Sequence, residues 1–160
     1  MAARLRAGAV AAAPNLMNDR IMSAGAELYR GGCLCSAVRY EAHGEPRYAG
    51  HCYCADCRKA SGSGFVPFMV FSADAVEFSG QPRQFVWKVA GGRQAVRNFC
   101  PDCGGLVFGG IVGVDTSFTL YAGSLDDPSR FHPRIAIFTR GHPDWALIPA
   151  ELTLFEDAPR

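Results

Sequence analysis

Seven cysteines in three tight groups constrain this chain more than any other feature of its sequence. The groups comprise Cys33 and Cys35, then Cys52, Cys54 and Cys57, then Cys100 and Cys103. An odd number of cysteines cannot pair completely as disulfides within one chain. Cysteines two or three positions apart are typical of metal sites, where short motifs supply thiolate ligands two at a time. The spacing therefore favours metal binding.

The cysteines divide into a set of four and a set of three. Cys100 and Cys103, followed by two glycines, have the form of a zinc knuckle. In such a turn the glycines let the backbone bend tightly, so that amide N–H groups point at the sulfurs. Cys33 and Cys35 would complete a closed site of four thiolates with this pair.

Cys52, Cys54 and Cys57 remain, and they lie within six residues of each other along the chain. Three protein ligands and one open position are the arrangement of a catalytic zinc. We therefore expect one closed site, and a second site that accepts a ligand from solution and carries the catalytic residues Cys52, Cys54 and Cys57.

Other uses of the cysteines stay open on the sequence alone. Six of them could form disulfides in an oxidising compartment. Cys54 and Cys57, or Cys100 and Cys103, could form a redox pair, although the surrounding pattern is not one of alternating strands and helices. In a purely structural module with two zinc ions, His51 or another side chain would close the second site.

Composition limits the class of protein. The chain has 160 residues, of which 49% are hydrophobic and 19% charged, which is typical of one folded domain. Its net charge of +1 gives no electrostatic case for a nucleic acid or a membrane surface as partner. No apolar run approaches the ~20 residues of a membrane span. No convincing secretion signal is present, so we expect a cytoplasmic protein.

The chain is predicted to consist of a poorly ordered N-terminal extension, residues 1–27, and one domain, residues 28–160. The 18 glycines and 10 prolines favour short strands and many turns, and hence antiparallel sheets. Pro67 predicts that its strand lies at an edge or contains a bulge. Strands are expected at 37–42, 65–71, 83–89, 95–99, 106–109, 117–122, 134–139 and 152–155, with helical turns at 56–61 and 126–130.

The cysteine groups, with their neighbours, resemble the glutathione-dependent formaldehyde-activating enzyme family, also called the centromere protein V or Gfa family. The resemblance rests on the segments GGCLCSAVRY, HCYCADCRKASGSGF and NFCPDCGG, and on AGSLDDP and HPRIAIF farther along the chain. It runs from about residue 29 to residue 155. Many members of the family have a polar residue or histidine where this chain has Tyr53.

The resemblance implies a zinc-bound β-tent built from small antiparallel sheets. It implies a structural zinc on Cys33, Cys35, Cys100 and Cys103, and a second zinc on Cys52, Cys54 and Cys57. The family's named activity joins formaldehyde and glutathione into S-hydroxymethylglutathione and is classed as a carbon–sulfur lyase. The family is functionally mixed, so a non-enzymatic zinc- or thiol-binding or interaction module with two structural sites is the alternative.

The chemistry predicted for the open site is the holding of a small thiol, such as glutathione, as its nucleophilic thiolate. Arg58 and Lys59 follow Cys57 directly, and they either meet a carboxylate of the thiol or form a solvated pair. Residues 61–64 either admit a ligand or form a turn. Asp126 and Asp127 are expected to form a cap or turn.

Overall fold

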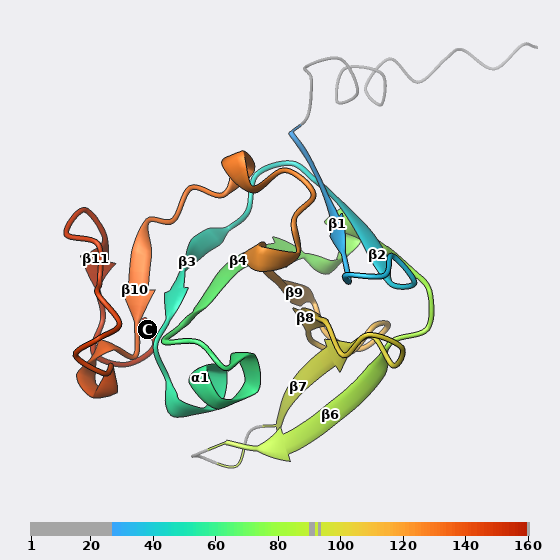
Figure 1. Ribbon diagram of the computed structural model, residues 1–160. Helices are drawn as coiled ribbons and strands as arrows, with labels where there is room; N and C mark the ends of the chain where they lie inside the picture. The colour runs from blue at the N-terminus through green and yellow to red at the C-terminus, as the bar shows by residue number, and fades with distance from the viewer. Residues whose placement is uncertain (1–26, 90–91, 93, 160) are drawn as a thin grey trace, which may run out of the picture.

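The computed structural model describes residues 27–89, 92 and 94–159, and β-strands are its main regular element (Figure 1). Three of them form an antiparallel sheet: β1 (Leu28–Gly32), β2 (Arg39–His43) and β5 (Val76–Ser79). An eight-stranded sheet has the order β11-β10-β3-β4-β9-β8-β7-β6. Its strands are β3 (Tyr48–Cys52), β4 (Val66–Ser72), β6 (Arg83–Lys88), β7 (Gln94–Phe99), β8 (Leu106–Gly109), β9 (Ser117–Tyr121), β10 (Ile135–Ile137) and β11 (Thr153–Leu154).

The prediction of a mainly β fold is confirmed. The pairings among β1 to β9 are antiparallel, and β10 adds parallel pairings with β3 and β11. Short helical elements connect the strands. They are α1 (Ala55–Ser61) and the 3₁₀ turns η1 (Ala73–Ala75), η2 (Ala122–Ser124), η3 (Pro128–Arg130) and η4 (Thr139–Gly141). Residues 1–26, most of the predicted extension, lie outside the described residues.

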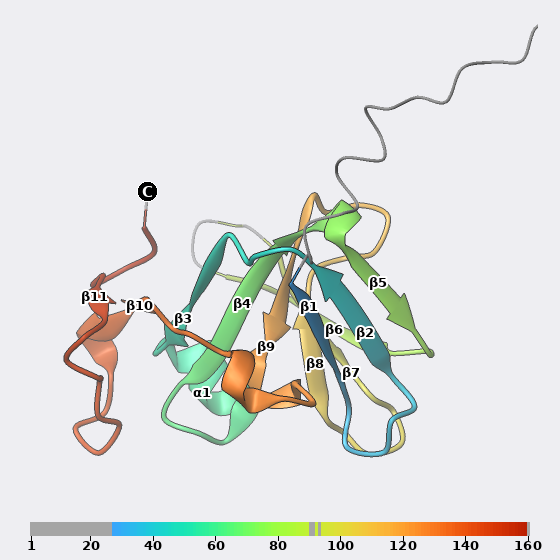
Figure 2. The ribbon, with the colours of Figure 1, turned by 90° about the horizontal axis from the view of Figure 1, so that it is seen from above.

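The main core lies between the two sheets. Phe78 of β5 stacks on Phe108 of β8 with ring centroids 3.9 Å apart, and Phe118 of β9 meets both rings edge-on. Tyr40 of the small sheet and Met69 of the large one are fully buried in the same cluster. Figure 2 shows the small sheet on one side of the molecule and β10 and β11 on the other.

A second, smaller apolar cluster attaches the C-terminal segment to β3 and β10. It contains Tyr53, Ala136, Ala146 and Leu152, with Phe65 packed against it. The hydroxyl of Tyr53 donates a hydrogen bond to the carbonyl of Leu147 at 3.2 Å. The residue after Cys52 is therefore fixed in the core, and this anchors the segment that carries the middle cysteine group.

The prediction for Pro67 is wrong, because β4 is an interior strand between β3 and β9. Pro67 faces His51 of β3, whereas the pairing with β9 starts only at Phe68. A proline has no N–H to donate to a sheet. Pro67 is the second residue of β4 and lies beyond the end of the pairing with β9. Its missing N–H therefore removes no hydrogen bond between β4 and β9.

All eight predicted strands are present within two residues of their expected bounds, whereas β1, β3 and β5 were not predicted. The hairpin of β6 and β7 is confirmed by the register from Arg83↔Phe99 to Lys88↔Gln94. The helical turn at 56–61 is α1, and that at 126–130 is reduced to η3. Asp127 caps η3 by accepting the N–H of Ser129 at 3.1 Å, and Asp126 pairs with Arg39 of β2.

Candidate functional site

The first cysteine cluster joins the turn after β1 to the turn between β7 and β8. The sulfurs of Cys33, Cys35, Cys100 and Cys103 all lie within 4.8 Å of one another. Cys35 Sγ is 3.6 Å from the sulfurs of both Cys33 and Cys100. Tetrahedral bonds of ~2.3 Å to one zinc ion would place sulfurs about 3.8 Å apart. These four side chains can therefore hold a metal ion as a closed site.

Backbone amides face the sulfurs of this cluster, as the knuckle predicts. The N–H of Val38 donates to Cys33 Sγ at 3.3 Å. The N–H of Gly105, followed by that of Cys35, lowers the pKa of Cys103 to about 6. Gly104 makes this turn possible at a φ of 70°, and its N–H donates to the carbonyl of Cys100 at 2.9 Å.

The second cluster forms where β3 ends and α1 begins. The sulfurs of Cys52, Cys54 and Cys57 lie within 4.8 Å of one another. Cys52 is the last residue of β3, and Cys54 is the N-cap of α1. The sulfur of Cys54 accepts the N–H of Cys57 at 3.3 Å, so helix capping itself brings two of the three sulfurs together.

The three thiols of this cluster share their protons unequally. Hydrogen bonds from Cys52, followed by Cys57, lower the pKa of Cys54 to about 2. The same contacts raise the pKa of Cys52 far above that of a free thiol. One thiolate therefore forms easily and the others do so with difficulty, because like charges repel at this distance. A bound cation would remove that repulsion.

Within the described part of the chain, the metal-capable group at this place contains the three cysteines and not His51. The His51 ring stacks instead on Phe65, with centroids 4.3 Å apart. Its Nδ1 is buried and has no hydrogen-bond partner among the described residues. The idea that His51 closes the second site therefore finds no support in the geometry.

A buried arginine completes this region, and the sequence analysis missed it. Arg97 of β7 is 6% exposed, and one guanidinium nitrogen lies 3.6 Å from Cys57 Sγ. Another donates to the Tyr121 hydroxyl at 3.3 Å. The guanidinium also lies over the Trp87 ring, 4.6 Å from its centroid. A charged residue inside a strand, three positions before Cys100, was the available signal.

The same contacts hold α1 against the hairpin of β6 and β7. Trp87 donates its indole N–H to Asp56 at 3.1 Å, and Asp56 directly precedes Cys57. Asp56, Trp87, Arg97 and Cys57 thus form a ring of contacts around the N-terminal turn of α1. The second cluster, which β3 and α1 carry, is therefore also held by contacts from β6 and β7.

The sequence model of the family described as "Glutathione-dependent formaldehyde-activating enzyme" matches residues 28–141, well over half of the chain. The chain belongs to this family. Its seven cysteines all lie inside the matched segment. No curated protein matches the chain. A crystal structure of a Rhodobacter sphaeroides protein is similar, with 19% identity over 61% of this chain and 87% of that one, and a TM-score of 0.46.

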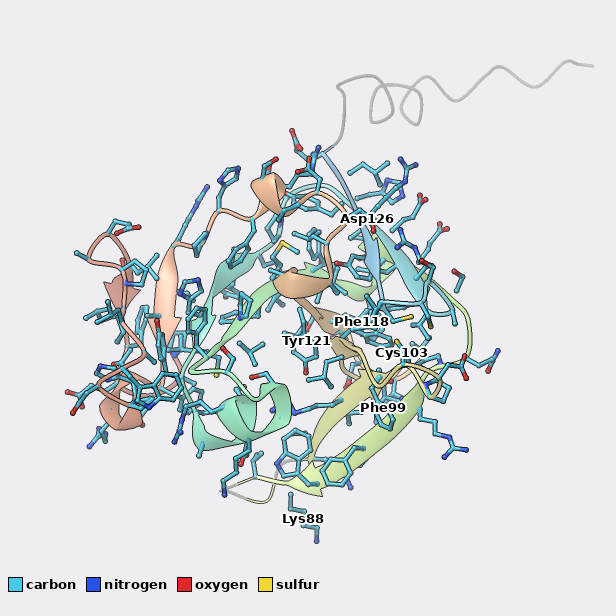
Figure 3. All side chains as sticks on the ribbon, in the orientation of Figure 1. Lys88, Phe99, Cys103, Phe118, Tyr121 and Asp126 are labelled. Atoms are coloured by element: carbon cyan, nitrogen blue, oxygen red, sulfur yellow. The ribbon has the colours of Figure 1, made fainter. Side chains whose placement is uncertain are left out.

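In this member of the formaldehyde-activating family, a cavity of about 310 Å³ lies between the C-terminal end of α1 and the knuckle. Ser61 and Ser63 line it on the α1 side, Gly104 and Leu106 on the knuckle side, and Tyr121 completes the wall. In the view of Figure 3 the labelled Tyr121 lies on the α1 side of Cys103. Burial raises the pKa of Tyr121 to about 12, so its hydroxyl keeps its proton at neutral pH.

The segment 61–64 of this family member forms the turn considered for it, and two of its residues also line the cavity. Gly62 ends α1 with a φ of 66° and donates its N–H to the carbonyl of Arg58. Ser61 and Ser63, on either side, line the cavity. Lys59 is exposed on α1, whereas Arg58 is half-buried and its Nε has no hydrogen-bond partner among the described residues. In the described residues, no helix is long and apolar enough to cross a membrane.

Proposed function

We propose that this protein is a zinc-dependent carbon–sulfur lyase of the formaldehyde-activating type. It joins formaldehyde to a small thiol such as glutathione, and splits the resulting hydroxymethyl adduct in the reverse direction. The observation that carries the proposal is the cluster of Cys52, Cys54 and Cys57, which offers three sulfur ligands and leaves the fourth position of a tetrahedral metal to a substrate. Membership of the family supports the choice of reaction.

Zinc fits both cysteine clusters. Thiolates are soft ligands that favour zinc over calcium or magnesium, and the sulfur spacing suits tetrahedral coordination. With four thiolates, the site of Cys33, Cys35, Cys100 and Cys103 is closed and structural. At the second cluster, zinc would stabilise the sulfur of the substrate thiol as a thiolate. Because three cysteine thiolates already neutralise its charge, this site suits a thiol better than activated water.

The proposed reaction forms one C–S bond and transfers one proton to the former carbonyl oxygen. The substrate sulfur attacks the carbonyl carbon of formaldehyde, a C–S bond forms, and the carbonyl π electrons move to oxygen, which takes up a proton. In the reverse direction the hydroxyl loses that proton, C=O re-forms and the C–S bond breaks. The proton needs a donor near the sulfur.

Arg97 and Tyr121 are the residues of this chain that we propose assist that step. Tyr121 lines the cavity beside α1, and its hydroxyl accepts a hydrogen bond from Arg97 at 3.3 Å. That bond leaves the phenolic O–H free to donate to an oxygen on which negative charge develops. Arg97 in turn contacts Cys57, so one cation bridges the sulfur cluster and the proton donor.

Arg58 is the candidate for binding a carboxylate of the thiol. Its half-buried guanidinium lies on α1 one position after Cys57, and its Nε has no protein partner in the described part of the chain. Arginine binds carboxylates through paired hydrogen bonds. Lys59 is exposed and would contribute only through its charge.

The test is an absorption spectrum of the cobalt-substituted protein, recorded with and without glutathione. Cobalt reports thiolate ligation optically. We expect glutathione to change the sulfur-to-metal bands, and S-methylglutathione, whose sulfur cannot ionise, to leave them unchanged. Equal spectra with both compounds would contradict an open site for thiols and favour a module with two closed, structural sites.

A rate measurement separates binding from catalysis. Exchange of free and adduct formaldehyde is followed by NMR with wild-type protein and with Cys54→Ser. We expect the wild type to accelerate exchange over the spontaneous reaction and the variant to leave it at the spontaneous rate. Thiol binding without acceleration would assign the protein to non-enzymatic thiol binding.

A further inference from the structure

A second cavity, of about 590 Å³, lies at the opposite end of β3 from the cysteine cluster. It is lined by Tyr48 and Ala49 at the start of β3, whereas Cys52 is the last residue of that strand. Tyr48 and Cys52 are four positions apart along the strand, a distance of roughly 13 Å. Cavities of roughly 300–1,000 Å³ commonly hold small molecules. None of the seven cysteines lines this one.

The floor of this cavity is apolar and belongs to the main core. Tyr29 is 4% exposed, Ala49 8% and Met69 0%. Pro46 and Ile135 contribute further apolar surface to the lining. The floor therefore suits the hydrocarbon part of a ligand and offers little to a hydrated inorganic ion.

Positive charge gathers around this floor. Arg47, Arg130 and Arg134 all line the cavity, against one carboxylate, Glu45. Glu45 accepts a hydrogen bond from the Tyr29 hydroxyl at 3.3 Å, and Arg130 lies over the Tyr29 ring, 5.1 Å from its centroid. Arg130 is paired with Glu27, whereas Arg47 and Arg134 form no ion pair with any residue that the structure describes.

The backbones of these two arginines are held in place. The N–H of Arg47 donates to the carbonyl of Val70 at 2.7 Å, and the N–H of Arg134 donates to that of Ala49 at 2.9 Å. The carbonyl of Arg134 also accepts the N–H of Thr153 at 3.0 Å. Two guanidinium groups are thus carried on fixed backbone beside one cavity, which reduces the entropy cost of binding an anion between them.

We propose that this cavity binds a small organic anion with an apolar body and one carboxylate or phosphate group. The body would lie against Tyr29 and Met69, and the anionic group would pair with Arg47 and Arg134. This site is separate from the cysteine cluster and does not depend on the lyase reaction.

The test uses the metal-loaded full chain and three probes of similar size. Benzoate, phenyl phosphate and the neutral benzyl alcohol are titrated, and binding is followed by amide chemical shifts in ¹H–¹⁵N NMR spectra. We expect saturable shifts around Ala49 and Arg134 with at least one anion, and binding of the alcohol weaker by at least about tenfold. A preference between benzoate and phenyl phosphate identifies the anionic group.

Variants decide whether the arginines recognise the anion. Arg47→Gln and Arg134→Gln both change exposed residues, so both variants are expected to fold normally. Each should weaken binding of the better anion about tenfold. Arg83→Gln, on the exposed face of β6, is the matched control and should not change it. Equal affinities in all three variants, or no saturable shifts with either anion, would overturn the proposal.

Discussion

The guanidinium of Arg97 lies 3.6 Å from the sulfur of Cys57, although the two residues are 40 positions apart in the chain. Arg97 is buried between the Trp87 ring and the Tyr121 hydroxyl, so its charge is shielded from water. A buried cation stabilises a nearby thiolate more strongly than an exposed one does, because the effective dielectric constant is lower. This contact connects β7, the strand that leads into the knuckle, with the second cluster.

Replacement of Arg97 should therefore weaken the second metal site and leave the first intact. We expect Arg97→Gln to lower metal affinity or turnover at the second cluster by about 10–100-fold, the usual effect of removing a partner of a metal ligand. Arg97→Lys should retain part of the function, since it keeps the charge but loses the planar stacking on Trp87. Metal content after dialysis against a chelator measures the effect.

The control for this prediction is Arg83→Gln on the neighbouring strand, where the arginine is exposed. It should retain the metal content of the wild type. Equal metal retention and turnover in Arg97→Gln and the wild type would show that Arg97 only packs.

The two cysteine clusters should respond differently to single serine substitutions. Cys54→Ser removes one sulfur but keeps a good N-cap for α1, since serine is among the preferred capping residues. We expect loss of one metal ion per chain and of turnover, with little change in the free energy of unfolding. Cys103→Ser should destabilise the whole domain, because a structural zinc contributes its binding energy, about 10–16 kcal/mol in small zinc domains, to folding.

Metal analysis together with thermal unfolding separates these outcomes. Unfolding of Cys54→Ser to the same extent as Cys103→Ser would mean that both clusters are structural. Unchanged metal content in Cys54→Ser would exclude the middle cysteine group as a metal site.

The metal-capable clusters could be predicted because their information is local in the sequence. A knuckle can be predicted from two cysteines three positions apart and the two glycines that follow them. A capping cysteine can be predicted from the helix that follows it. The four-plus-three partition of the cysteines agrees with the two groups that the fold brings together. Gly104, with its positive φ, lies in the tight turn that the sequence predicts for the glycine pair.

The role of Arg97 and the existence of β3 could not be predicted, because both depend on contacts across the sheet. The sequence of β3, YAGHC, has little preference for a strand. It forms one because it pairs with β4 along its whole length and because Gly50 lets β10 approach on the other side, where a Cβ would lie 2.3 Å from the carbonyl oxygen of Ile135. The prediction from Pro67 was wrong for a related reason. Whether a proline excludes an interior strand depends on where the pairing with the next strand, here β9, starts.

Gly104 offers a test of how strongly the knuckle depends on backbone conformation. A Cβ at this position meets no atom within 4 Å, so strain at its φ of 70° is the only cost of Gly104→Ala. We expect a loss of stability of about 1–2 kcal/mol and faster release of zinc to a chelator. Gly104→Asn should cost less, since asparagine tolerates this conformation.

Gly113→Ala is the matched control, because Gly113 has a φ of 79° and equally open space. It should cost similar stability without changing zinc release. Equally fast zinc release in both alanine variants would show that the backbone conformation of Gly104 does not itself determine how tightly the knuckle binds zinc.

The hydroxyl of Tyr121 should matter for the reaction and little for the fold. Tyr121→Phe removes the O–H that lines the 310 Å³ cavity and leaves the ring in place. We expect the rate of adduct exchange to fall about 10²-fold or more, as for other groups that donate a proton in the transition state. The free energy of unfolding should fall by about 1–3 kcal/mol, because the buried Arg97 guanidinium loses one hydrogen-bond acceptor. Tyr53→Phe is the matched control, since it also removes a tyrosine hydroxyl, one bonded to Leu147 outside the cavity lining. The proposed role of Tyr121 requires normal metal content in both variants and slow exchange in Tyr121→Phe alone, and equal exchange rates in the two would exclude it.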